Sequence, residues 1–243
     1  MKGKKMKHAE MTQSTAVIHC KKDGLELGAA IASLTESGAA ALEARLAPVL
    51  TDGEEMPDVR LLLRLMGRLA EREVAAVDEA DAARWQAGMR LLSLRDRCRE
   101  TKAELRAALV KVRKVLVELF GSSYTRLRFG LGARTARGAA DLALEAGRIL
   151  RRLVSGPALP EPETPGLTIA PRAWTQTLRP VIDRLERLLR EVEAARIRLS
   201  DLAGERDRRL ESSRATYLQV ARSVETLFAL AGEAELAKGV TLY

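Results

Sequence analysis

Histidine is nearly absent from this chain of 243 residues, because His8 and His19 are the only two. Histidine is the commonest metal ligand and general base in proteins. Without it, the rest of the chain cannot build a Ser-His-Asp or Cys-His catalytic site, or the Glu-x-x-His pairs of a di-iron bundle. Cys20 and Cys98 lie 78 positions apart, which does not match the paired spacing of a zinc site. We therefore expect that the protein is not an enzyme and that it holds no metal or cofactor.

Carboxylates are the catalytic groups that the composition leaves available, since the chain has 33 acidic residues. On helices rich in arginine and glutamate, acidic side chains four residues from a basic one usually form ion pairs on a solvated face. An enzyme or ligand carrier that uses carboxylates buried in a helical bundle is the alternative that this leaves open.

Long apolar runs are also missing, and no stretch approaches the ~18 consecutive apolar residues of a membrane-spanning helix. The basic N-terminus lacks the apolar segment of a signal peptide, since its longest apolar run is residues 16–18. Two cysteines in the whole chain are typical of a reducing compartment. We expect a soluble, cytoplasmic protein.

Aromatic residues make up only 3% of the chain, although 47% of it is apolar and 30% is charged. The core must therefore be built from leucine, valine and alanine, and these residues together with arginine and glutamate are typical of long helices. The sequence predicts an all-α fold.

A first long helix is predicted over residues 58–120, which contain no proline and only the glycines 67 and 88. Its apolar positions recur at alternating steps of three and four, the spacing of a coiled-coil seam. The clearest part comprises residues 91, 94, 98, 101, 105, 108, 112, 115 and 119. A weaker continuation towards residue 63 is interrupted by Glu73 and Arg84.

A second long helix is predicted over residues 176–231, with Thr177 as its N-cap and Pro180 in its first turn. Its seam comprises residues 178, 181, 185, 188, 192, 195, 199, 202, 206, 210, 213, 217, 220, 224, 227 and 231. The polar seam residues Thr101, Arg206 and Ser213 should weaken the packing locally. Each long helix is either continuous or broken once, the first near Gly88 and the second near Gly204.

The predicted organisation is a flexible basic tail (1–24), a helical segment (25–154), a Pro-rich linker (155–175) and a second long helix completing the same bundle (176–243). The helical segment contains shorter helices over 25–48 and 138–154, and Gly121 ends the long helix before a loop over 121–138. We expect the two long helices to pack antiparallel with the shorter ones laid against them. The alternative is a compact bundle in which each long helix folds into a hairpin.

Positive charge is concentrated in residues 121–154, which carry seven arginines against Asp141 and Glu145. The candidate anion-binding residues are Arg126, Arg128, Arg134, Arg137, Arg148, Arg151 and Arg152. Arginine with flexible glycine can hold a phosphate, and aromatic rings can stack on bases. The alternative is a turn whose arginines meet the acidic segment 26–55.

Three aromatic residues, Tyr124, Phe129 and Trp174, are the candidate contacts with a protein partner, because such rings are enriched at interfaces. The alternative for Trp174, as for Trp85, is burial inside the monomer. The function predicted first is a non-enzymatic scaffold or adaptor that binds a protein partner or forms a homo-oligomer. The second is a binder of nucleic acid or another anionic surface through the basic tail and the arginines of residues 126–152.

Overall fold

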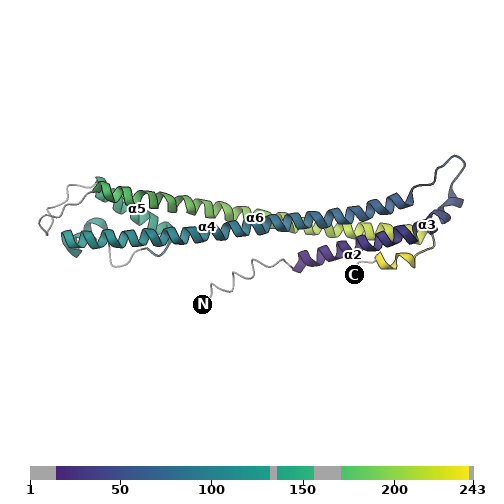
Figure 1. Ribbon diagram of the computed structural model, residues 1–243, viewed down its shortest axis with the longest axis horizontal. Helices are drawn as coiled ribbons and strands as arrows, with labels where there is room; N and C mark the ends of the chain where they lie inside the picture. Colours follow the sequence, from purple (N-terminus) through teal and green to yellow (C-terminus); the bar gives the residue numbers. More distant parts are fainter. Residues whose placement is uncertain (1–14, 132–135, 156–170, 241–243) are drawn as a thin grey trace. The chain divides into compact units, whose positions relative to one another are not determined.

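The computed structural model describes residues 15–131, 136–155 and 171–240, and these form five α-helices and two short 3₁₀ segments with no β-strand among them (Figure 1). The elements are α2 (Thr15–Ser37), α3 (Ala39–Leu46), η1 (Ala47–Val49), α4 (Val59–Phe129), α5 (Ala139–Ser155), α6 (Pro171–Leu230) and η2 (Leu236–Val240). The all-α prediction is confirmed, as are the two long helices.

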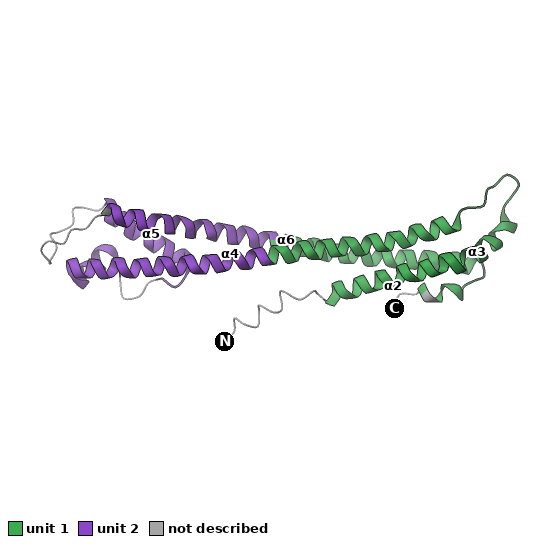
Figure 2. Cartoon of the chain, in the orientation of Figure 1, with its two compact units in different colours: residues 1–88, 199–243 green, residues 89–198 purple. Residues whose placement is uncertain are grey.

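The chain divides into two compact units, and both long helices contribute to each (Figure 2). Unit 1 contains residues 1–88 and 199–243, and unit 2 contains residues 89–198. Each unit has its own aliphatic core, and predicted seam positions of both long helices contribute to each core.

The core of unit 1 joins α2 and α3 to the first part of α4 and the last part of α6. Ile31 and Leu34 of α2 are buried with Leu63 and Val77 of α4 and with Val224 of α6. Burial of such side chains stabilises the unit by about 25 cal/mol per Å² of apolar surface removed from water.

The first helix begins at Thr15, which corrects the assignment of residues 15–24 to a flexible tail. Val17, Cys20 and Gly24 are buried and extend the apolar stripe of the helix by two turns, so the segment has a core to pack against. Residues 1–14 of that predicted tail lie outside the described residues.

Gly38 separates α2 from α3, so the predicted helix over 25–48 is divided in two. A Cβ at this position would come within 2.7 Å of the Phe228 ring. The glycine therefore allows the ring to approach the backbone of this segment.

The core of unit 2 joins α5 to the middle part of α4 and the first part of α6. Leu105 and Leu116 of α4, Leu142 and Ile149 of α5, and Leu185 of α6 are all buried in it. The predicted helix over 138–154 is therefore confirmed as α5, with bounds that differ by one residue at each end.

Two further boundaries differ from the prediction. Gly121 leaves the helical conformation (φ 74°), as expected, but helical structure resumes and continues to Phe129, so residues 122–129 are not a loop. Phe129 is buried in the core of unit 2, which explains why this turn folds back as helix.

The last long helix begins at Pro171, before the predicted start at residue 176. Thr177 is not its N-cap, because its Oγ1 donates a hydrogen bond to the carbonyl of Ala173 inside the helix. Trp174 packs against the core of unit 2 and gives the extra turn an apolar contact. Residues 156–170 of the predicted Pro-rich linker lie outside the described residues.

The helical backbone runs without interruption through Gly88 and Gly204, so neither long helix is broken at its glycine. The cost of one glycine within a helix is only about 1 kcal/mol. Burial of the flanking seam residues offsets that cost, since Leu91, Leu94, Leu202 and Leu210 are all buried.

Candidate functional site

The predicted anion-binding arginines lie in unit 2, on the last turns of α4, in the turn that follows and along α5. Arg126, Arg137, Arg148 and Arg151 are exposed. Arg152 donates a hydrogen bond from Nη1 to the carbonyl of Arg128 at 3.2 Å, which brings α5 to the end of α4. Arg134 lies outside the described residues. The acidic segment 26–55 belongs to unit 1.

A groove of about 420 Å³ opens beside these arginines, between the end of α4 and α5. Arg148 and Arg152 line it, and so do Asp141 and Glu145. Glu145 Oε2 accepts a hydrogen bond from the backbone N–H of Ala136 at 2.8 Å, so this carboxylate holds the turn in place. The groove therefore presents charges of both signs.

The aromatic candidates differ in accessibility. Phe129 is buried and forms a cluster with Phe120 and Tyr124, in which the Tyr124 ring lies 5.5 Å from Phe120 and 6.4 Å from Phe129. Tyr124 and Trp174 are half-buried and pack against the same core. Of the three rings, only Tyr124 and Trp174 are therefore partly accessible at the surface. Trp85, by contrast, is 50% exposed in unit 1.

Two polar residues that interrupt the predicted seams, Glu73 and Ser213, meet in the core of unit 1. Glu73 of α4 is 5% exposed, and its Oε2 accepts a hydrogen bond at 2.9 Å from Oγ of Ser213, which is fully buried on α6. A buried carboxylate is costly unless it is hydrogen-bonded. The sequence predicted Ser213 as a weak point, whereas the structure pairs it with Glu73.

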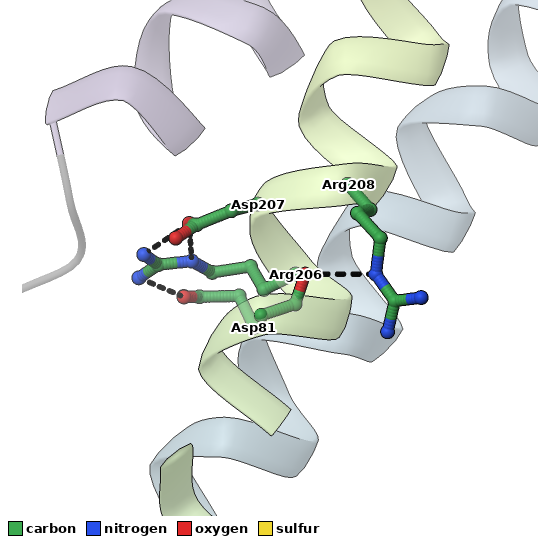
Figure 3. A network of polar contacts seen from close by, with 5 residues as sticks. Asp81, Arg206, Asp207 and Arg208 are labelled. Atoms are coloured by element: carbon green, nitrogen blue, oxygen red, sulfur yellow. Dashed lines mark hydrogen bonds and ion pairs between the residues drawn. The ribbon is translucent and has the colours of Figure 1, made fainter. Parts of the chain in front are cut away.

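Arg206 is another polar seam residue of unit 1, and Figure 3 shows its guanidinium between Asp81 of α4 and Asp207 of its own helix. Its Nη2 lies 2.5 Å from Asp207 Oδ1, and its Nη1 lies 4.0 Å from Asp81 Oδ1. The side chains of Arg206 and Asp81 are only 12% and 9% exposed. The neighbouring Arg208 points away and donates to the carbonyl of Gly204. The buried carboxylates Glu73 and Asp81 thus both lie beside a side chain of α6, Glu73 through a hydrogen bond and Asp81 through a longer ion pair in which its Oδ1 accepts no hydrogen bond.

Tyr217 lies next to this polar region and is almost fully buried. Burial raises the pKa of its phenol above the usual value of 10, and the neighbouring Cys20 and Glu73 raise it further. Burial also raises the pKa of the Cys20 thiol, although Arg214 opposes this effect. A buried thiol with a raised pKa is a poor nucleophile.

The sequence reasoning missed an exposed leucine surface on α4. Leu61, Leu62 and Leu65 are 47%, 41% and 50% exposed, on a face of the helix other than the one that builds the core. We define the outer stripe of α4 as the positions that continue this face at steps of four, three, four, three and four: Asp58, Leu62, Leu65, Leu69, Arg72 and Ala76. Asp58, Leu62, Leu65 and Arg72 are exposed, whereas Leu69 and Ala76 are half-buried and Leu69 also packs against the core of unit 1. The same spacing that predicted the core seam could have revealed this stripe, since it is displaced by only one residue, or about 100° around the helix.

The described residues contain neither a metal-binding cluster nor a membrane-spanning helix. No group of three or more His, Cys, Asp or Glu side chains in this part of the chain is placed to hold a metal ion. Of the helices in the described ranges, none combines the length and apolarity needed to cross a membrane.

Comparisons of this chain with family models, with curated proteins and with solved structures found no match.

Proposed function

We propose that this protein is a non-enzymatic helical scaffold or adaptor that binds a protein partner, or itself, through the surface of its helices. The observation that carries the proposal is the leucine surface of α4, where three large apolar side chains within five positions keep 41–50% of their surface exposed. Isolated exposed leucines are common on protein surfaces, but a contiguous apolar patch is typical of an interaction site.

The organisation of the two units is consistent with such a role. We infer that α4 and α6 pack antiparallel in a coiled-coil manner. In unit 1, Glu73 of α4 pairs with Ser213 of α6, and Asp81 of α4 pairs with Arg206 of α6. From the first pair to the second, the residue number increases along α4 and decreases along α6, so the two helices run in opposite directions there. Long helices paired in this way expose extended faces on which a partner helix can lie.

The test is affinity purification of the full chain and of a Leu65→Glu variant. Glu at position 65 places a charge in the leucine surface, and because the side chain is half exposed, the fold should tolerate it. Leu218→Glu is the matched control, since Leu218 is 44% exposed on α6 in the same unit. We expect Leu65→Glu, and not Leu218→Glu, to lose the bound protein or the self-association.

The proposal would be wrong if the wild-type chain remained monomeric and recovered no protein. It would also be wrong if both variants behaved like the wild type. Circular dichroism of each variant establishes that the helices are intact.

The second candidate function is binding of nucleic acid or another anionic surface through the basic tail and the arginines of residues 126–152. Arg126, Arg137 and Arg148 favour it, because they are exposed and make no ion pair within the described part of the chain. Binding of this kind weakens steeply as the salt concentration rises.

Titration with DNA, RNA and acidic vesicles at low and moderate salt tests this candidate. Replacing Arg126, Arg137 and Arg148 together by alanine should abolish a salt-sensitive shift, whereas replacing the exposed Arg222 of unit 1 should not. Absence of any shift at low salt would exclude it.

A further inference from the structure

We infer that the partner of the leucine surface is a second copy of this chain, bound antiparallel along the outer stripe of α4 about a two-fold axis at Leu65. This inference rests on the proposed function and identifies the partner. It follows from the distribution of charge along the stripe.

The outer stripe carries opposite charges at its two ends. Asp58 stands at the start, preceded by the exposed acidic residues Asp52, Glu54 and Glu55, and Arg72 stands near the other end. Asp58 and Arg72 each lie seven positions from Leu65, which is a distance of about 10 Å along a helix. An antiparallel pair centred on Leu65 therefore places Asp58 of each copy level with Arg72 of the other.

Both charged groups are available for this contact. Asp58 caps α4 by accepting a hydrogen bond from the N–H of Leu61 at 2.8 Å, and this bond uses only its Oδ1. Arg72 is exposed, and its guanidinium makes no ion pair within the described ranges. Each end of the pair then joins an unpaired guanidinium to a carboxylate oxygen.

The apolar residues have the same symmetry. In the antiparallel arrangement Leu65 faces Leu65, and Leu62 of one copy lies beside Leu69 of the other on one side of the axis. A two-fold interface requires a self-complementary patch of this kind. A parallel pair would keep the leucine contacts but would place Asp58 beside Asp58 and Arg72 beside Arg72, and like charges oppose that register.

The interface is short, because its apolar part extends over only a few turns of one helix. Interfaces of this size are at the weak end of the range for specific protein pairs. We therefore expect a reversible dimer whose population rises with protein concentration and falls with salt.

Cysteine crosslinking tests the geometry directly in the full chain. Cys98 is first replaced by serine, and Cys20 can remain because its side chain is fully buried. Under mild oxidation, Leu65→Cys should form an intermolecular disulfide, because position 65 faces itself across the axis. Leu218→Cys, with similar exposure on α6, should form it at least tenfold more slowly.

The orientation is tested by mixing two single variants that carry different tags. Leu62→Cys mixed with Leu69→Cys should give mainly the disulfide between the two different variants. Self-linkage of Leu62→Cys alone would indicate a parallel pair and would overturn the antiparallel arrangement.

Sedimentation over a range of concentrations completes the test and separates this inference from the proposed function. A chain that stays monomeric, or Leu65→Cys that links no faster than Leu218→Cys, refutes the dimer. If the monomeric chain still binds a different protein and Leu65→Glu abolishes that binding, the scaffold proposal stands without the dimer. If neither binding occurs, both fail.

Discussion

Replacing Gly24 by alanine should destabilise unit 1, although alanine is the better helix former. Gly24 is buried within α2, and a Cβ there would lie 2.5 Å from Tyr217 Oη and 2.5 Å from Val74 Cγ2. Both neighbours are buried, so neither side chain can move away freely. Overpacking of this kind costs about 1–3 kcal/mol, and the gain in helix propensity returns up to about 1 kcal/mol. We expect a net loss of roughly 1–2 kcal/mol in the free energy of unfolding.

The matched control is the same substitution at Gly204, which is also helical and belongs to the same unit. Gly204 is exposed and no atom lies within 4 Å of the position of its Cβ. Gly204→Ala should therefore raise the free energy of unfolding by about 0.5–1 kcal/mol, because alanine loses less backbone entropy on folding. The two substitutions change the chain identically, so their opposite signs isolate the packing.

Urea denaturation followed by circular dichroism and by tryptophan fluorescence measures both variants. Trp85 belongs to unit 1 and Trp174 to unit 2, so a Trp174→Phe background restricts the fluorescence signal to the unit that contains both glycines. A Gly24→Ala variant at least as stable as the wild type would refute the close packing of Tyr217 on α2. Combining Gly24→Ala with Tyr217→Phe should recover part of the loss, because the hydroxyl is one of the obstructing atoms.

Three further predictions concern the polar residues in the core of unit 1. Ser213→Ala should cost about 1–3 kcal/mol in urea denaturation, because it leaves the buried Glu73 carboxylate without its donor, and adding Glu73→Leu should recover part of that cost. Arg206→Ala and Asp81→Ala should be non-additive in a double-mutant cycle by about 0.5–3 kcal/mol, and additivity would show that the ion pair contributes nothing. The pKa of Tyr217 is raised in the folded state, so its contribution to stability should be complete below pH ~10 and should be lost as the pH rises through the folded-state value. Tyr217→Phe should flatten that part of a stability–pH curve, and an unchanged curve would contradict the assignment.

Much of the fold could be predicted from the pattern of apolar residues. The seam positions along residues 91–119 and 178–231 are all buried or half-buried. Helical geometry explains this, because residues spaced by three and four lie on one side of a helix. Helix boundaries were less predictable. Thr15, Phe129 and Trp174 lie in segments whose local composition favoured a tail, a loop and a linker, and tertiary contacts with a core made them helical.

The candidate site was predicted less well than the fold. The spacing of residues along α4 contains both the core seam and the outer stripe, and nothing local distinguishes the face that is covered from the face that remains exposed. The concentration of arginines in residues 121–154 is visible in the sequence, whereas the structure shows that Asp141 and Glu145 line the same groove as Arg148 and Arg152. Only the folded chain shows which charges share a surface.

The sequence alone determined that this chain is helical, because aliphatic residues at steps of three and four can leave water only along one side of a helix. The tertiary structure decided how the polar interruptions are used. Glu73 and Ser213 are 140 positions apart in the chain, and the packing of α4 against α6 brings them together. The hydrogen bond from the hydroxyl to the carboxylate then makes it possible to bury both groups in a core. The same packing leaves Leu61, Leu62 and Leu65 at the surface, since one helix can turn only part of its circumference towards its neighbours.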